Sequence, residues 1–321
     1  MLEARLELAA RDGWFNLPGR ICVLGARAGA DLSALGPDLQ IVQRHKPDFD
    51  ALTAAGYDVR LTPEGAFAAA LVVLPRSKLL ARHRIAQAAE LAPVVFVDGQ
   101  KTDGIDSLQR EIRARAQVDA PLAKAHGKLL RVTGGRFDDW RQGEGRIPGG
   151  YVTSPGSFSA DGIDHGSALL GDALPMLKGS VADLGAGWGY LSRRVLERDS
   201  VTVCHLVEAD HDALECARRN VADSRARFHW ADATRWRPAD ALDHVVTNPP
   251  FHAGRTADPD LGRAFLVTAA RSLRPSGRLW LVANRHLPYE QALSECFART
   301  EEIGGDAGFK VLCCSKPRTG R

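Results

Sequence analysis

The sequence predicts an α/β protein that contains two doubly wound sheets, one in each half of the chain. In both halves, short apolar runs alternate with longer amphipathic stretches, a rhythm typical of parallel sheets covered by helices. A stretch dense in glycine and proline, residues 134–157, separates the halves and is expected to be a linker or extended loop. In the second half, the apolar runs end in glycine, acidic or amide residues. Doubly wound sheets bind ligands at such strand ends, so this half is expected to carry the functional site.

Residues 1–133 are expected to form the first domain. Its predicted strands are the apolar runs 21–25, 71–75 and 94–98, and helices are expected over 78–91 and 105–118. Because strand and helix alternate, we expect a parallel sheet here too.

Residues 158–321 are expected to form the second domain, with helices and strands in regular alternation. The expected helices are 160–177, 189–198, 211–220, 260–273 and 289–298. The expected strands are 180–184, 201–208, 226–231, 241–247 and 277–284, followed by a closing pair near 300–315.

The bulk composition is that of a soluble globular protein, with 45% hydrophobic and 25% charged residues among 321. No apolar run approaches the roughly 20 residues that span a membrane, and the acidic N-terminus does not resemble a signal peptide. The six cysteines contain no C-x-x-C pair, so we expect no metal site, no disulfide framework and a reducing cytoplasm. A net charge of +3 permits RNA binding without arguing for it.

The most informative motif is Asn248-Pro249-Pro250-Phe251, which follows the predicted strand 241–247. Two prolines cannot donate to a sheet ladder, so the strand must end there, and each forces an extended residue before it. The resulting stiff corner offers an amide, main-chain carbonyls and an aromatic ring. The oxygens can accept hydrogen bonds from a planar group that carries an NH₂, and the ring can stack on its face.

A second motif is the glycine-rich turn Gly185-Ala186-Gly187-Trp188-Gly189 after the predicted strand 180–184. Glycines let the backbone approach a ligand closely. Asp183 stands within the strand end, where a phosphate-binding loop would not place a carboxylate. A cationic or amino-acid-bearing ligand is the better match.

Together the two motifs resemble those of the class I S-adenosylmethionine-dependent methyltransferases. Further segments resemble the bacterial ribosomal RNA guanine-N2-methyltransferases, namely small-subunit methyltransferase C and large-subunit methyltransferase G. The matching segments are 157–170 (SFSADGIDHGSALL), 248–254 (NPPFHAG), 282–289 (VANRHLPY) and 309–311 (FKV). The resemblance implies a class I methyltransferase fold, Rossmann-like, in the C-terminal half.

The resemblance also implies cofactor contacts. Asp183, Gly185 and Gly187 would hold the amino-acid end of S-adenosylmethionine, with the carboxylate pairing to its ammonium directly or through water. Glu208, at the end of the next strand, would accept from both ribose hydroxyls. Asp232 would receive the adenine amino group. Trp188 and Ala233 would flank the ring, with packing as the alternative for Trp188.

On the substrate side, the Asn248 side-chain oxygen and the Pro249 carbonyl would accept from the guanine amine, and Phe251 would stack on the base. These hydrogen bonds would make the amine nitrogen more nucleophilic. His252 is expected to have a structural or RNA-contacting role, and Arg285 and His286 to contact substrate or cap a helix. His165 is expected to line the cofactor pocket or to have no specific role.

The first half is expected to be a degenerate duplicate of the methyltransferase domain, as in the family, with an unrelated α/β domain as the alternative. Residues 25–29 (GARAG) would replace the glycine turn, and 74–78 (LPRSK) would replace the proline corner. We expect a monomer that methylates guanine N2 in ribosomal RNA, 16S rather than 23S, free or within a subunit. The alternatives are methylation of adenine N6 or of a protein glutamine amide, and a non-catalytic RNA-binding assembly factor.

Overall fold

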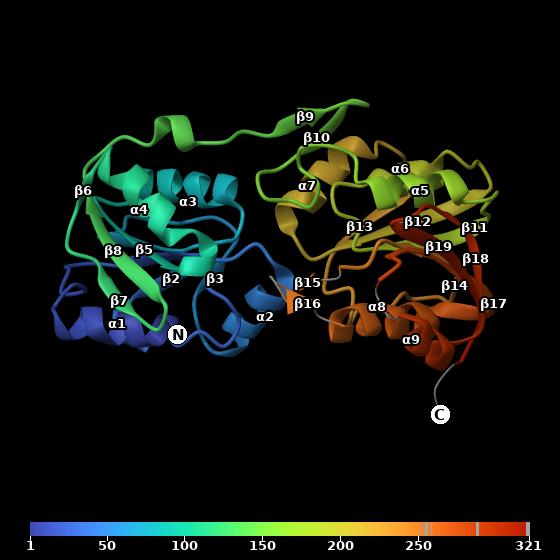
Figure 1. The fold of residues 1–321 in the computed structure, drawn as a ribbon, viewed down its shortest axis with the longest axis horizontal. Helices are drawn as coiled ribbons and strands as arrows, with labels where there is room; N and C mark the ends of the chain where they lie inside the picture. The colour runs from blue at the N-terminus through green and yellow to red at the C-terminus, as the bar shows by residue number, and fades with distance from the viewer. Residues whose placement is uncertain (251, 254–255, 258, 287–288, 319–321) are drawn as a thin grey trace. The chain divides into compact units, whose positions relative to one another are not determined.

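The computed structural model describes residues 1–250, 252–253, 256–257, 259–286 and 289–318, and it divides into two compact units, Met1–Gly143 and Glu144–Arg321 (Figure 1). The division falls inside the glycine- and proline-rich stretch 134–157. Each unit is built around its own twisted sheet, with helices on both faces.

The first unit has a sheet of eight strands in the order β3-β2-β1-β4-β5-β8-β6, with β7 also paired to β8. Strands β1 to β5 are parallel, whereas β6, β7 and β8 run antiparallel to their neighbours, so the expectation of a purely parallel sheet was wrong at this edge. The predicted helix 105–118 ends at Arg113, and the chain then turns into β6. The elements are α1 (Leu2–Arg11), β1 (Ile21–Leu24), β2 (Leu39–Val42), α2 (Lys46–Ala54), β3 (Val59–Arg60), β4 (Ala69–Val73), α3 (Lys78–Leu91), β5 (Val94–Gln100), α4 (Ile105–Arg113), β6 (Gln117–Val118), β7 (Leu122–Lys124) and β8 (Gly127–Thr133).

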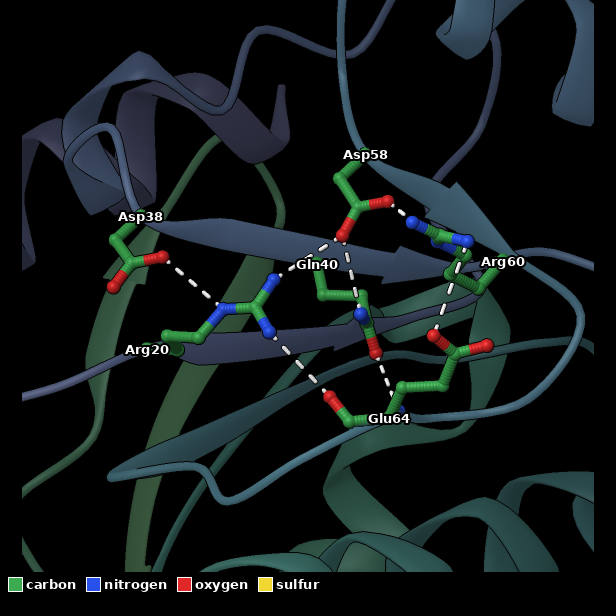
Figure 2. Close-up of polar contacts among 6 residues, drawn as sticks. All are labelled: Arg20, Asp38, Gln40, Asp58, Arg60 and Glu64. Carbon is green, nitrogen blue, oxygen red and sulfur yellow. Dashed lines mark hydrogen bonds and ion pairs between the residues drawn. The ribbon is translucent and has the colours of Figure 1, made fainter.

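A polar network joins the amino ends of the strands β1, β2 and β3 of this sheet (Figure 2). Arg20, just before β1, donates to Asp38 and Asp58, which precede β2 and β3, at 3.1 Å each. Hydrogen bonds from Gln40 and Arg60 help hold the pKa of Asp58 below its usual value. Gln40 also accepts the amide of Glu64 at 2.7 Å. The network therefore fixes the register of three strands at the edge opposite to their carboxyl ends.

The second unit has a seven-stranded sheet in the order β13-β12-β11-β14-β17-β19-β18, preceded by the small hairpin β9–β10. Among the described strands of the large sheet, β19 runs antiparallel to both of its neighbours, β17 and β18, and the other neighbouring strands pair in parallel. The elements are β9 (Gly145–Ile147), β10 (Tyr151–Thr153), α5 (His165–Ala173), β11 (Gly179–Leu184), α6 (Tyr190–Leu196), β12 (Val201–Glu208), α7 (His211–Asn220), β13 (Ala226–Trp230), β14 (Leu242–Thr247), β15 (His252–Ala253), β16 (Thr256–Ala257), α8 (Pro259–Ser272), β17 (Leu273–Asn284), α9 (Tyr289–Cys296), β18 (Phe297–Gly305) and β19 (Phe309–Pro317).

Helices cover both faces of this second sheet (Figure 1). Apolar residues of α5, α6 and α7 pack on one face, and those of α8 and α9 pack on the other. Along β11 the side chains alternate between the faces, with Val181 in one core and Ala182 and Leu184 in the other. The six cysteines are unpaired and buried in these cores and those of the first unit.

The two large sheets share one strand plan. In each, the first three strands run outward from the centre, the fourth and fifth lie on the other side of the first, and an antiparallel strand follows the fifth. This repetition confirms the expectation of two Rossmann-like sheets, and the duplication of one half from the other stays a prediction.

Helix α5 is shorter than the predicted helix 160–177. It begins at His165 because the Asp164 side chain accepts the amide of Ser167 at 2.8 Å and so caps the helix. It ends at Ala173, before Leu174 and Pro175, because a residue that precedes proline is pushed out of helical geometry.

Candidate functional site

The glycine turn and the proline corner lie at the same edge of the second sheet. They follow β11 and β14, which pair in parallel with Asp183 opposite Val246. The hydroxyl of Thr247, the last residue of β14, donates to the carbonyl of Leu184 at 2.7 Å. This bond joins the two strand ends directly before the residues predicted to bind ligands.

The glycine turn needs glycine at alternate positions. Gly185, Gly187 and Gly189 have φ angles of 74°, 55° and 91°, which side-chain-bearing residues rarely adopt. A Cβ on Gly189 would also lie 2.8 Å from Val221, whereas a Cβ on Gly187 would meet no atom within 4 Å. The backbone at Gly187 is thus open to a ligand, while Gly189 is required for packing.

Asp183 is the buried charge of the site. Asp183 is 0% exposed, and its Oδ2 accepts a hydrogen bond from the Ser192 hydroxyl at 2.7 Å. Its Oδ1 has no hydrogen-bond partner among the residues that the structure describes. Burial, reinforced by the nearby charge of Glu208, raises the pKa of this carboxyl to about 7. A carboxylate so placed would be stabilised by a cationic ligand.

Glu208 and Asp232 both lie at strand ends, as predicted. The Glu208 carboxylate is half-buried and accepts the amides of Gly187 and Asp210 at 2.7 Å each, so it also holds the glycine turn in place. Burial raises the pKa of Glu208. Asp232 follows β13 and accepts both the amide and the hydroxyl of Thr234, at 2.8 and 2.6 Å.

The Asn248 amide is held by two residues that the sequence motifs do not assign to the site. Its Nδ2 donates to Asp164 Oδ2 and to Ser167 Oγ, each at 2.9 Å. A sequence signal exists for Asp164 alone, because an aspartate directly before an apolar helical run is a typical N-cap. That pattern reveals the cap but not the contact with a residue 84 positions away.

A pocket opens where these groups meet. Its lining includes Asp164, Ser167, Gly185, Gly187 and Asn248. Phe158, which is 64% exposed, also lines the pocket. The backbone carbonyl of Phe158 accepts a hydrogen bond from Trp188 Nε1 at 2.9 Å. Trp188 lines the pocket as well, but its ring is 4% exposed and packs against Tyr151 and Tyr190.

Four other residues predicted for the site are Pro249, Ala233, Phe251 and His252. Pro249 is buried directly after Asn248, and Ala233 is buried in the core beneath α8. Phe251 lies outside the described residues, as does the side chain of His252, whose backbone is in β15.

Arg285, a predicted substrate contact, and His165, predicted to line the cofactor pocket, are both engaged with β18 or the turn that follows it. The guanidinium of Arg285 pairs with Glu302 at 2.6 Å and donates to the carbonyl of Asp306. His165 Nε2 lies 2.5 Å from the Asp306 carboxylate, and this contact lowers the pKa of Asp306 to about 2. His286 is exposed and its amide donates to Asn284.

The corresponding strand ends of the first unit are filled by its own side chains. Gln43, which follows β2, donates to the carbonyl of Ala26 in the turn after β1 at 2.5 Å, and Asp48 of α2 accepts the amide of Ala28 in the same turn at 2.8 Å. The guanidinium of Arg84 lies so close to Gly25 that a Cβ there would have no room. Directly after β4, the buried Leu74 stands at the position that corresponds to Asn248 in the second unit.

Neither a membrane span nor a metal cluster is found in the part of the chain that the structure describes. No helix there is both long and apolar enough to cross a bilayer, and no three His, Cys, Asp or Glu residues come together as metal ligands.

The fold and the site define a class I methyltransferase architecture, and comparisons with known proteins agree. Residues 150–313 match the model of the Methyltransferase small domain. The chain is 32% identical to Ribosomal RNA large subunit methyltransferase G of Streptomyces avermitilis, over 92% of this chain and 87% of that protein. It is 29% identical to Ribosomal RNA small subunit methyltransferase C of Aeromonas hydrophila, over 79% of each chain.

One solved structure is similar along almost the whole chain. It is the T. thermophilus 16S rRNA N2 methyltransferase RsmC in complex with AdoMet (S-adenosylmethionine) and guanosine. The TM-score is 0.79 at 25% identity, covering 95% of this chain and 92% of that one. The chain therefore belongs to the Methyltransferase small domain family, and its likeness to RsmC extends through both units.

The raised pKa of Asp183 gives a test of the site in the ligand-free protein. Because its folded-state pKa lies above the ordinary 3.8, Asp183 binds its proton more tightly in the folded protein than in the unfolded chain. The bound proton therefore stabilises the folded protein at low pH, and this stabilisation is lost as the pH rises toward about 7. Between about pH 5 and pH 8, Asp183 should therefore reduce the free energy of unfolding by about 3 kcal/mol, at about 1.4 kcal/mol per pKa unit. We expect Asp183→Asn to remove this part of the pH dependence, as measured by urea unfolding.

Asp161→Asn, at an exposed aspartate of the same unit, is the matched control and should leave the pH dependence as in the wild type. Equal pH dependence in Asp183→Asn and in the wild type would show that Asp183 ionises normally and is not a strained buried charge.

Proposed function

We propose that the chain methylates the exocyclic N2 amine of a guanine in ribosomal RNA, 16S rather than 23S, with S-adenosylmethionine as the methyl donor. The observation that carries the proposal is the Asn248 amide, whose NH₂ is bonded to Asp164 and Ser167 at the wall of the pocket. Among the described residues no hydrogen bond reaches its carbonyl oxygen, which can therefore accept from a substrate amine. The whole-length relatives are ribosomal RNA methyltransferases by name, which supports RNA as the substrate.

The residues present fit the proposed cofactor. The unpartnered, buried oxygen of Asp183 suits a ligand that carries an ammonium group, reached through a bound water because Asp183 is closed off from solvent. The open backbone at Gly187 lets the ligand approach closely. Glu208 and Asp232 add acceptors at the next two strand ends, suited to ribose hydroxyls and an adenine amine.

In the reaction, S-adenosylmethionine supplies a methyl group already activated by its sulfonium, so the protein mainly has to position the nucleophile. The guanine amine donates to Asn248 Oδ1 and to the Pro249 carbonyl. These bonds draw the nitrogen toward a tetrahedral geometry and stabilise the positive charge that develops on it. Phe251 stacks on the base and His252 and Arg285 contact the RNA; for Arg285 this requires release from Glu302.

A base inside a helix cannot reach a pocket at a strand end. The target guanine is therefore single-stranded or flipped out of its stack when it reacts. The chemistry of the corner by itself also accepts adenine N6 or a glutamine amide, since each presents a planar NH₂.

A 23S target is the second candidate, because the relative at 32% identity across 92% of the chain is a large-subunit enzyme by name. The 16S assignment is preferred because the similar solved structure and several whole-length relatives are small-subunit enzymes by name.

The first test is Asn248→Ala. Loss of a hydrogen bond made in the transition state should lower turnover by about 10²-fold or more, while the dissociation constant of S-adenosylmethionine stays nearly unchanged. The measurement is mass mapping of N2-methylguanine in 16S and 23S rRNA from a deletion strain that expresses either the wild-type or the variant chain.

Asn16→Ala makes the same chemical change in the first unit and is the matched control, with normal turnover expected. Restoration of a methylated guanine by Asn248→Ala at the wild-type rate would remove this amide from the mechanism. Methylation restored on adenine or on a protein, and not on guanine, would replace the proposed substrate.

The filled strand ends of the first unit predict how many S-adenosylmethionine molecules one chain binds. Side chains of Gln43, Asp48 and Arg84 occupy the space around its turn. Arg27 stands in that turn, paired with Asp48 at 3.5 Å, so the turn offers a ligand cation no free carboxylate of the kind that Asp183 provides. We expect one S-adenosylmethionine per chain by isothermal titration calorimetry. Two equivalents bound per chain would contradict this expectation and place a second cofactor in the first unit.

A further inference from the structure

The Asn248 amide is held by a carboxylate and a hydroxyl that belong to a different element, the start of α5. Asp164 Oδ2 and Ser167 Oγ each lie 2.9 Å from Asn248 Nδ2. The same Asp164 oxygen accepts the Ser167 amide at 2.8 Å, as the N-cap of the helix. One carboxylate oxygen thus starts a helix and binds the amide at the corner.

The two ends of an asparagine amide have nearly the same shape but opposite hydrogen-bonding roles, since the oxygen accepts and the nitrogen donates. A substrate amine brings N–H donors and so needs the oxygen. An amide turned by 180° would place N–H against N–H. The reaction therefore depends on which end of the Asn248 amide faces the pocket.

Of the two partners, only Asp164 can decide this orientation. The Ser167 hydroxyl both donates and accepts, so it bonds equally well with either end of the amide. An ionised carboxylate only accepts, so it admits the NH₂ end and rejects the oxygen. The N-cap bond holds the carboxylate in place for this purpose.

We propose that Asp164, supported by Ser167, is a positioning residue that turns the carbonyl end of the Asn248 amide toward the substrate amine. The inference rests on the proposed function, because it assigns how the acceptor of that reaction is oriented. Asp164 lines the pocket as well, but the role proposed for it acts through Asn248.

The test is a double-mutant cycle of Asp164→Ala and Asn248→Ala, with turnover on 16S rRNA measured at saturating S-adenosylmethionine. Asp164→Ala alone should lower kcat by about tenfold, because the amide loses its fixed orientation. Asp164→Ala in the Asn248→Ala background should cause no further loss beyond about twofold, because no amide remains to be oriented. A further tenfold loss in the double variant would show that Asp164 acts independently of Asn248 and would overturn the proposal.

Asp164→Asn is the conservative variant. Its amide oxygen can accept from both the Ser167 amide and Asn248 Nδ2, so it should keep kcat within about threefold of the wild type. A loss as large as that of Asp164→Ala would show that the charge of Asp164, and not its orienting bond, is required.

Loss of the helix cap needs its own control. Ser77 caps α3 in the first unit by accepting the amide of Leu80 at 3.2 Å. Ser77→Ala should lower stability by about as much as a lost cap does, with kcat unchanged. A fall in kcat for Ser77→Ala equal to that for Asp164→Ala would assign the effect to cap loss and would overturn the positioning role.

A second readout needs no catalysis. The side-chain NH₂ resonances of Asn248, identified by their disappearance in Asn248→Ala, report the bonds to Asp164 and Ser167 directly. We expect hydrogen exchange of this NH₂ to be at least about tenfold faster in Asp164→Ala than in the wild type, and equal exchange rates would overturn the proposal. A wild-type chain that methylates no guanine would refute the proposed function without changing this result.

Discussion

The parallel pairing of β11 with β14 is the constraint on which the functional site depends. Because the strands run in the same direction, the glycine turn after one and the proline corner after the other emerge at one edge. Thr247 locks the two ends together through the carbonyl of Leu184. The two prolines restrict the backbone angles of Asn248 and of the residues that follow it, so the position of Asn248 is fixed by the strand end. The amide after one strand thus faces the backbone turn after the other.

The site also contains a group that opposes folding. A carboxylate enclosed in the core costs free energy unless it is paired, and Asp183 has one hydrogen bond for its two oxygens within the described residues. Its location beside the glycine turn agrees with the proposed function, in which a cationic ligand would supply the missing partner and so offset this cost. Glu208, the proposed partner of the ribose hydroxyls, also holds the glycine turn in place because its carboxylate accepts the Gly187 amide.

Much of this arrangement can be predicted from local sequence. Two adjacent prolines after an apolar run mark a strand end, and alternate glycines mark a turn with positive φ, so local patterns are enough to point to Asn248, Asp183 and Gly187. The partners of Asn248 cannot be found in this way, because Asp164 and Ser167 are brought to it by packing of α5 across a long stretch of chain. The engagement of Arg285 by Glu302 likewise depends on the placement of β18, which no local pattern shows.

The central claim is that the carbonyl oxygen of Asn248 receives the amine of guanine. A crystal structure of the chain with S-adenosylhomocysteine and guanosine tests it most directly. We expect guanine N2 at about 3 Å from Asn248 Oδ1, as in an ordinary hydrogen bond, with Nδ2 still bound to Asp164. Guanine N2 placed away from Asn248, or an amide turned so that Nδ2 faces the base, would contradict it.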